Sequence, residues 1–488
     1  MKHGRAEVLH LLLSHADGRR PFLEQGLPAE AAGRAPEPER VPGRADVPWL
    51  EAPEALPDDL PAQRWGVIAP EGREGDAMRQ AVAPLIQHRA GEQGAEVRLY
   101  RAPANLDALG AVKWRKTQYR IESEPEAERP KYLLILGDLH QVSIELQHVL
   151  AHGAYVGRLH ISRPSGEPDL EGYTAYANKV RAFETDTAAS EAPDVLLFAA
   201  DDGSNATRWG RELLVEPCQK LVEQRWMPKR PGLRLQVLSH EQARLEQLLR
   251  AAATARAGVM LSVSHGLGLP TPAEASVEEQ RARQGALDLG GGQVLAREQL
   301  RDTPFLPGGM WFSLACFSAA TPPRSMFHPW LAQLAQQKVY ESPLDAVLQC
   351  LPRPDARPFV TALPQAALSN PRGPLAIIGH SDLAWMFSFS EGEAVLQSRA
   401  SRIASVLEVL SKGSRAGVAL DTLMRVYRDA NDDLAADAHV RRQAELDGAP
   451  DPVDPREHAY RWMLRNDLRG YILLGDPAAR LSFRSATA

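Results

Sequence analysis

Cysteine is scarce in this sequence, which contains only Cys218, Cys316 and Cys350 among its 488 residues. Three cysteines cannot form a disulfide framework, and their spacing does not match a metal-binding motif. A chain with so few cysteines fits a reducing compartment. We therefore expect no structural disulfides and no bound metal.

Long apolar runs and strong net charge are also lacking. No run reaches the length of a membrane span, and Val8–Leu13 is too short for a signal peptide and is not followed by a small-residue cleavage site. The net charge of −6 is mild for this length, and no basic stripe with interleaved aromatic residues is present, which argues against a nucleic-acid partner. These features predict a cytoplasmic protein with no membrane span.

Alternating strand and helix patterns fill most of the chain from Arg64 onward. Such alternation is typical of a parallel α/β fold, and 488 residues exceed the size at which one core stops growing, so two subdomains are expected. The predicted strands are 64–70, 95–103, 131–138, 193–200, 234–241, 258–263, 310–315 and 471–477. The predicted helices are 76–88, 142–152, 173–184, 212–224, 242–253, 394–412, 416–428 and 456–468.

The N-terminal part has a different composition. Glu7–His15 is predicted to form a short helix. The stretch Pro21–Pro61 is rich in proline, charged and small residues and contains too few apolar residues to build a core. We interpret this stretch as a solvated linker, a tether, a docking segment or a removable pro-segment.

Two apolar strands end in residues that can carry chemistry. In the stretch Ala257–Gly268, the strand 258–263 leads into His265. The strand Met310–Ala315 leads into Cys316. The carboxyl ends of parallel strands meet at one edge of the sheet, where active sites gather. The pattern therefore predicts an imidazole and a thiol at the same edge. Asp201 and Asp202, which follow the strand 193–200, fall there too, although Asp-Asp-Gly is also an ordinary turn sequence.

These segments resemble the His and Cys motifs of clan CD cysteine peptidases, which include caspases, separases, legumains and gingipains. SHG after one strand and LACFSAATP after the next carry the resemblance, and the gingipain family is the most similar. GPLAIIGHSDLAW (373–385), YILLGDPAARLSF (471–483) and KYLLILGD (131–138) also resemble its segments, so the match covers most of 64–483.

The resemblance implies a caspase-haemoglobinase-like α/β fold with two parallel-sheet subdomains side by side and a helical C-terminal region. It divides the chain into an N-terminal extension with a proline-rich linker (1–62), a non-catalytic subdomain (63–190), a catalytic subdomain (191–391), and C-terminal helices with a closing strand (392–488). It further implies an acidic residue that supports the catalytic histidine. Asp202 matches that position, with Asp201 as its alternative.

The chemistry expected of this pair is acyl transfer from a peptide. Cys316 is the predicted nucleophile and His265 the base that takes its proton and then protonates the leaving amine. The backbone N–H groups of Gly266 and Cys316 are candidates for binding the oxyanion. This mechanism requires no cofactor.

The residues that select the substrate are less well defined. By resemblance, the loop containing Ser381, Asp382 and Trp385 forms a wall of the pocket for the residue before the cleaved bond. Asp201 or Asp382 would favour a basic residue there, whereas Arg208 would favour an acidic one. Because there are two candidate acids and one candidate base, we expect a basic residue before the cleaved bond. The glycine-rich stretch 271–307 is expected to be a loop beside the site, which closes over substrate or is cut during maturation.

Three functions are compatible with the sequence. The favoured one is a cysteine endopeptidase that cuts specific partner proteins. By analogy with caspase-like peptidases encoded beside bacterial gasdermins, its substrate would be a pore-forming gasdermin-like protein and its role antiviral defence or programmed cell death. The alternatives are an inactive caspase-like scaffold that binds partner proteins, and a small-molecule hydrolase or acyltransferase that uses the same Cys/His pair.

Overall fold

The computed structural model describes residues 8–28, 30–31, 56–121, 125–186, 192–271, 273–338, 344–352, 357–392 and 396–483. Most of the proline-rich stretch, residues 32–55, lies outside these ranges, as do residues 187–191 of the expected connection between subdomains. Among the described helices, none is long and apolar enough to cross a membrane.

One ten-stranded sheet organises the molecule, in the order β5-β4-β6-β7-β20-β17-β14-β10-β8-β9. Its strands, listed in chain order, are β4 (Trp65–Pro70), β5 (Arg98–Ala102), β6 (Tyr132–Leu136), β7 (Tyr155–Leu159), β8 (Asp194–Ala199), β9 (Arg234–Leu238), β10 (Val259–Val263), β14 (Met310–Leu314), β17 (Ala376–His380) and β20 (Tyr471–Gly475). Each strand expected from the apolar runs therefore forms, and the α/β fold class is confirmed.

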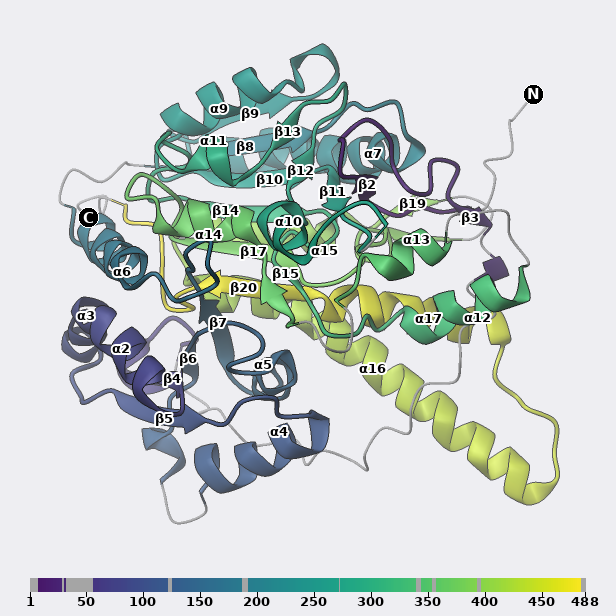
Figure 1. The fold of residues 1–488 in the computed structure, drawn as a ribbon, viewed down its shortest axis with the longest axis horizontal. Helices are drawn as coiled ribbons and strands as arrows, with labels where there is room; N and C mark the ends of the chain where they lie inside the picture. Colours follow the sequence, from purple (N-terminus) through teal and green to yellow (C-terminus); the bar gives the residue numbers. More distant parts are fainter. Residues whose placement is uncertain are drawn as a thin grey trace.

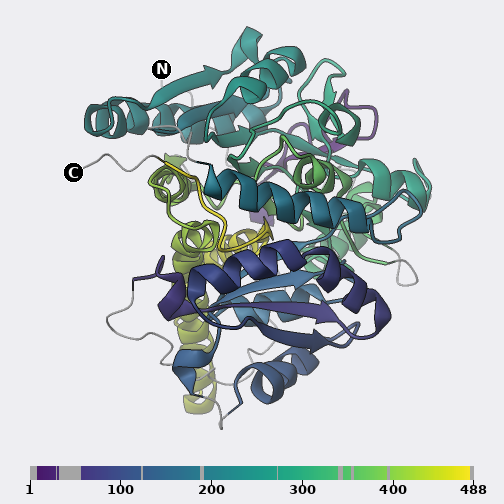
Figure 2. The same cartoon turned by 90° about the vertical axis from the view of Figure 1, so that its left-hand side faces the viewer.

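The sheet consists of two parallel halves joined at an antiparallel seam. Strands β5, β4, β6, β7 and β20 are parallel to one another, and so are β17, β14, β10, β8 and β9. Only β17 and β20 pair antiparallel within this sheet. Figure 2 shows the two halves one above the other, with the purple and blue early part of the chain below the teal and green later part.

Helices cover both faces of the sheet, as the hydrophobicity of the strands requires. In the first half, Val67 and Leu134 pack into the main apolar cluster of the molecule, whereas Ile68 and Leu133 pack into a separate one on the opposite face. The principal helices are α2 (Arg73–Ala81), α3 (Ala83–Gln93), α4 (Ala108–Trp114), α5 (Ile144–Ala151), α6 (Leu170–Thr185), α7 (Asn205–Gly210), α8 (Glu216–Leu221), α9 (Leu245–Thr254), α12 (His328–Gln337), α14 (Ala362–Ser369) and α15 (Ser401–Ser411).

Two C-terminal helices extend away from the sheet. Helix α16 (Ala416–Asp447) has 32 residues, much longer than the predicted 416–428, and α17 (Pro455–Arg469) packs along it before the chain enters β20. Figure 1 shows the far end of α16 projecting beyond the body of the molecule. Exposed polar residues dominate its second half, so the apolar periodicity that marks a core helix fades there although the helix continues.

The N-terminal segment differs from its prediction. Instead of a helix over 7–15, its described part forms β1 (Val8–Leu9) and β2 (Leu13–His15), followed by β3 (Leu27–Pro28), which pairs with β1. Four consecutive positions, from Leu9 to Leu12, are almost completely buried. A helix would have turned part of this apolar run toward solvent, whereas an extended chain between two packed surfaces buries all of it.

Strand β2 belongs to a small second sheet, ordered β13-β12-β11-β2. Its other strands are β11 (His265–Gly268), β12 (Leu287–Asp288) and β13 (Val294–Leu295). Figure 1 shows the purple β2 among these teal strands, on the opposite side of the view from α2 and α3. The stretch 271–307, expected to be a loop, instead supplies β12, β13, α10 (Val277–Arg283) and α11 (Arg297–Leu300).

Candidate active site

Three neighbouring strands bring the candidate catalytic residues to one edge of the sheet. Strands β8, β10 and β14 are adjacent and parallel, so their carboxyl ends coincide. Asp202 follows β8, His265 follows β10 and Cys316 follows β14. The strand order that the sequence pattern required is thus present.

His265 is buried, and one of its ring nitrogens is held by two side chains. Its Nε2 lies 3.2 Å from Oδ2 of Asp202 and 3.0 Å from Oγ of Ser204. Its Nδ1 has no hydrogen-bond partner among the described residues. A carboxylate beside Nε2 orients the ring and stabilises its protonated form, which leaves Nδ1 as the nitrogen available for proton transfer.

The carboxylate of Asp202 is itself well supported. Burial raises the pKa of Asp202, but hydrogen bonds from His265, Thr207 and the Ser204 backbone outweigh it and hold this pKa below its usual value. Oδ1 accepts from Thr207 Oγ1 at 2.6 Å and from the Ser204 N–H at 2.9 Å. The structure therefore brings Asp202 to the histidine, whereas Asp201 is exposed and lies 4.0 Å from His240.

The thiol of Cys316 is buried and contacts the backbone of Ala384. Its Sγ accepts a hydrogen bond from the Ala384 N–H at 3.1 Å and lies 3.7 Å from the Ala384 carbonyl oxygen. Burial raises the pKa of Cys316 well above its usual value, so the thiol is protonated at neutral pH. No hydrogen bond joins Cys316 to His265 in the described part of the chain.

Two backbone N–H groups between these side chains converge on one oxygen. The Gly266 N–H and the Cys316 N–H donate to the carbonyl oxygen of Leu12, at 2.8 and 3.1 Å. These are the two donors predicted to bind an oxyanion. A side chain on Gly266 would place its Cβ 1.9 Å from the Cys316 carbonyl oxygen, so only glycine allows the two backbones to approach this closely.

Of the predicted pocket residues, Trp385 lies beside the site. It is fully buried, its ring packs on Trp330 and Phe327, and its backbone pairs with that of Leu11. Ser381 is engaged elsewhere, because its hydroxyl donates to the Gly470 carbonyl oxygen at 3.0 Å.

The three charges expected to select a substrate are not free in a pocket. The buried carboxylate of Asp382 accepts from the N–H groups of Met326 and Leu383, at 2.8 and 2.7 Å, and burial raises its pKa. Arg208 is exposed, donates to Asn205 and stacks over Trp209. Together with the exposed Asp201, these contacts do not support the expectation of a basic preference.

Sequence analysis missed several residues of the site. Asp288 lies opposite His265 in the ladder between β11 and β12, and its carboxylate accepts from the Ser14 hydroxyl and from the Gly290 N–H. Burial raises the pKa of Asp288 although both hydrogen bonds lower it. An acid before a triple glycine is a visible signal for Asp288, and Ser204 is recognisable as an N-cap of α7. Nothing marks Leu12 within its apolar run.

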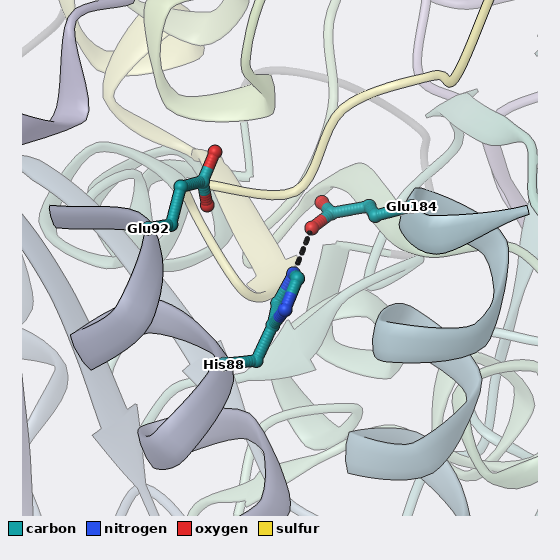
Figure 3. Close-up of side chains that lie close together, drawn as sticks. All are labelled: His88, Glu92 and Glu184. Carbon is teal, nitrogen blue, oxygen red and sulfur yellow. Dashed lines mark hydrogen bonds and ion pairs between the residues drawn. The ribbon is translucent and has the colours of Figure 1, made fainter.

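A separate His/Glu cluster lies at the interface of α3 and α6. Figure 3 shows His88 and Glu92 on α3 facing Glu184 at the end of α6. Their ligand atoms are close enough to hold a metal ion. However, Arg89 donates to both glutamates at 2.6–2.9 Å, and Arg415 donates to Glu92 at 2.6 Å. Since guanidinium groups already neutralise both carboxylates, the donor set fits an ion-pair network better than a cation site.

The fold and the site together define an α/β protein with a buried cysteine, a carboxylate-supported histidine and paired N–H donors at one sheet edge. No family model matches the chain, and no curated protein matches it.

Three solved structures are similar to 86% of this chain. They are a protease (15% identity, TM-score 0.48, 78% of that chain covered), the Arg-specific cysteine proteinase gingipain R (11%, 0.47, 78%), and a complex of the pro- and mature domains of Porphyromonas gingivalis RgpB (12%, 0.45, 79%). Gingipain is also the family that the sequence motifs resemble.

Proposed function

We propose that this chain is a cysteine endopeptidase with Cys316 as nucleophile and His265 as general base and acid. The observation that carries the proposal is the convergence of the Gly266 and Cys316 N–H groups on a single peptide carbonyl oxygen. Such paired donors stabilise the negative charge that develops on a carbonyl oxygen during acyl transfer. One donor belongs to the proposed nucleophile itself, and the other belongs to the residue after His265.

The proposed reaction follows from these positions. The Cys316 thiol gives its proton to His265 Nδ1 as Sγ bonds to the substrate carbonyl carbon, and the two N–H groups bind the resulting oxyanion. The tetrahedral intermediate collapses, the C–N bond breaks, and His265 returns the proton to the leaving amine. Water then attacks the thioester, which releases the new carboxylate and restores the thiol. Asp202 stabilises the imidazolium throughout.

The competing proposal is an inactive scaffold that binds partner proteins. Two observations favour it: the Cys316 thiol is buried with a raised pKa, and no described hydrogen bond links it to His265. A protonated thiol without its base is a poor nucleophile. The gasdermin-like substrate and the role in defence stay predictions by analogy with caspase-like peptidases, and the cytoplasmic location stays a prediction from the composition of the sequence.

The test is cleavage of a diverse peptide library, read by mass spectrometry, with wild type, Cys316→Ala and His265→Ala. Cys218→Ala is the matched control because Cys218 is equally buried but lies in α8, away from the site. We expect cuts from wild type and the control, and none from the two site variants. Cleavage by Cys316→Ala would refute the assigned nucleophile, and inactivity of every protein would favour the scaffold.

A further inference from the structure

The N-terminal segment passes through the candidate site as an extended peptide. Before the site, the Leu12 N–H donates to the Ala384 carbonyl oxygen at 3.3 Å and Leu11 forms an antiparallel bridge with Trp385. Beyond it, β2 runs parallel to β11, with Leu13 opposite Gly266. An added strand held by main-chain hydrogen bonds is a common way for a protein to bind a peptide.

Leu12 occupies the reacting position within this peptide. Its carbonyl oxygen accepts both N–H donors proposed to bind the oxyanion. The Ala384 backbone that receives the Leu12 N–H also contacts the Cys316 thiol. The peptide bond between Leu12 and Leu13 is therefore placed as a scissile bond would be.

The environment of this residue is apolar. Leu11, Leu12 and Leu13 are completely buried and belong to the main hydrophobic cluster, which also contains Cys316 and Trp385. The carboxylate of Asp382, which would have attracted a basic side chain, is occupied by backbone N–H groups. Burying a charged side chain without a partner costs several kcal/mol, so an apolar side chain is the one such a site accepts.

Contacts C-terminal to Leu12 hold the segment in place. The Ser14 hydroxyl donates to Asp288, and the Phe22 N–H donates to the Leu13 carbonyl oxygen at 3.0 Å. His10, N-terminal to Leu12, is buried, and its Nδ1 has no hydrogen-bond partner among the described residues. The segment is thus held at the site by its backbone and by the Ser14 side chain.

We propose that residues 8–15 occupy the peptide-binding groove of their own chain, with Leu12 as the residue before the scissile bond. The groove accordingly accepts peptides with leucine or a similar apolar residue at that position, and such a peptide enters the wild-type groove only in competition with the segment. This inference rests on the proposed function for the identity of the groove. The substrate residue before the cleaved bond is then apolar, and not basic as the sequence led us to expect.

The first test opens the groove in the full chain. Leu12→Asp places a charge in the apolar position, and we expect alkylation of Cys316 by iodoacetamide, mapped by mass spectrometry, to become faster by about tenfold or more, because a buried unpaired charge favours release. Leu12→Met is the matched control and should label like wild type. Leu146→Asp, at an equally buried leucine in α5, controls for general destabilisation. Unchanged Cys316 labelling in a folded Leu12→Asp variant would overturn the proposal.

The second test measures the preference directly and does not require Leu12→Asp to fold. Acetyl-Leu-His-Leu-Leu chloromethyl ketone copies residues 9–12 of the segment with Leu12 at the last position, and its lysine and aspartate counterparts differ only there. Thioether formation with Cys316 expels chloride. We expect the leucine probe to label Cys316 in wild type and in Leu12→Asp faster than either counterpart, and an equal or charged preference would overturn the proposal.

Binding without turnover separates this inference from the proposed function. A fluorescein-labelled Leu-His-Leu-Leu peptide amide, which copies residues 9–12, is titrated into the double variant Leu12→Asp, Cys316→Ala and followed by anisotropy. Selective binding, combined with no cleavage of any library peptide by Leu12→Asp, would refute the peptidase and leave the apolar peptide groove standing. Cleavage after residues other than apolar ones would refute the groove's preference and leave the peptidase standing.

Discussion

At the scale of single residues, the histidine is the best-organised part of the candidate site. Asp202 and Ser204 both reach Nε2 of His265, and the low pKa of Asp202 keeps a negative charge beside the ring across the physiological pH range. The thiol, in contrast, lies in its protonated form against Ala384. His265 is thus already oriented, and activation of this site depends on bringing its Nδ1 within hydrogen-bonding distance of the Cys316 thiol.

Asp202→Asn tests the supporting role of the carboxylate. The amide keeps the size of the side chain but removes the charge that stabilises the imidazolium, so we expect peptidase activity to fall about 10²- to 10⁴-fold with little change in melting temperature. Asp201→Asn, one residue away and exposed, should retain activity. A comparable loss in both variants would show that the turn, and not the charge at position 202, matters.

The chemistry of these residues was predictable from the sequence to different degrees. Cys316, His265 and Asp202 each follow a buried strand, and parallel strands bring such positions together regardless of the loops between them. Leu12 was not predictable, because a leucine in an apolar run carries no sign of which surface it will cover. Its position depends on contacts with residues more than 250 positions away.

At the scale of elements, the sequence predicts eight of the ten strands of the large sheet but not β7 or β17, and its prediction for the N-terminal segment is wrong. Strands β6, β10 and β14 are apolar at nearly every position, which is characteristic of parallel strands covered on both faces. Residues 8–13 are also mostly apolar but too few for periodicity to separate a helix from a strand. The extended form is stabilised by β11, because the edge of β11 that does not pair with β12 pairs with β2.

The close approach of β11 to the chain after β14 has its own test in Gly266→Ala. The added Cβ would lie 1.9 Å from the Cys316 carbonyl oxygen, so the two segments must separate. We expect destabilisation of about 1–3 kcal/mol in chemical denaturation, together with loss of peptide cleavage.

Gly91→Ala is the matched control for this substitution. Gly91 lies within α3, and an added Cβ meets nothing within 4 Å. Alanine there should stabilise the protein by about 0.5–1 kcal/mol, since it restricts the unfolded chain and favours helix. If Gly266→Ala were equally harmless, the contact between the two backbones would have no importance for the fold.

At the scale of the whole molecule, an ion-pair network joins parts of the chain that are distant in sequence. Arg89 of α3 donates to Glu184 at the end of α6 and to Asp476 after β20. Glu92 links the same network to Arg415 at the start of α16. Asp476 also accepts from the Trp65 indole of β4 at 2.8 Å. The network therefore ties the first half of the sheet to its central seam and to the C-terminal helices.

This network predicts a specific loss of stability in acid. Burial raises the pKa of Glu184, but Arg89 and His88 outweigh it and lower this pKa to about 2 from its usual value of 4.5. Its contribution to the free energy of unfolding is therefore complete above about pH 4.5 and is lost as the pH falls toward 2. Denaturation of wild type and Glu184→Gln at several pH values should show a difference at pH 7 that shrinks below pH 4.5.

Glu246→Gln provides the reference for that series. Glu246 is highly exposed, and its ion-pair partner among the described residues is Arg250, one helical turn later. Its substitution should therefore change stability by less than about 0.5 kcal/mol at every pH. A difference between wild type and Glu184→Gln that stays constant from pH 7 to pH 3 would contradict the network's role.

The position of β20 has a consequence for how this protein is made. It follows every other strand of the large sheet along the chain, yet it lies in the middle of that sheet between β7 and β17. On the ribosome, both neighbours therefore present open edges until residues 471–475 emerge. Open strand edges pair with other chains, so a nascent or prematurely terminated chain would tend to aggregate. Once β20 is synthesised, it pairs with both edges and joins the two halves into one sheet.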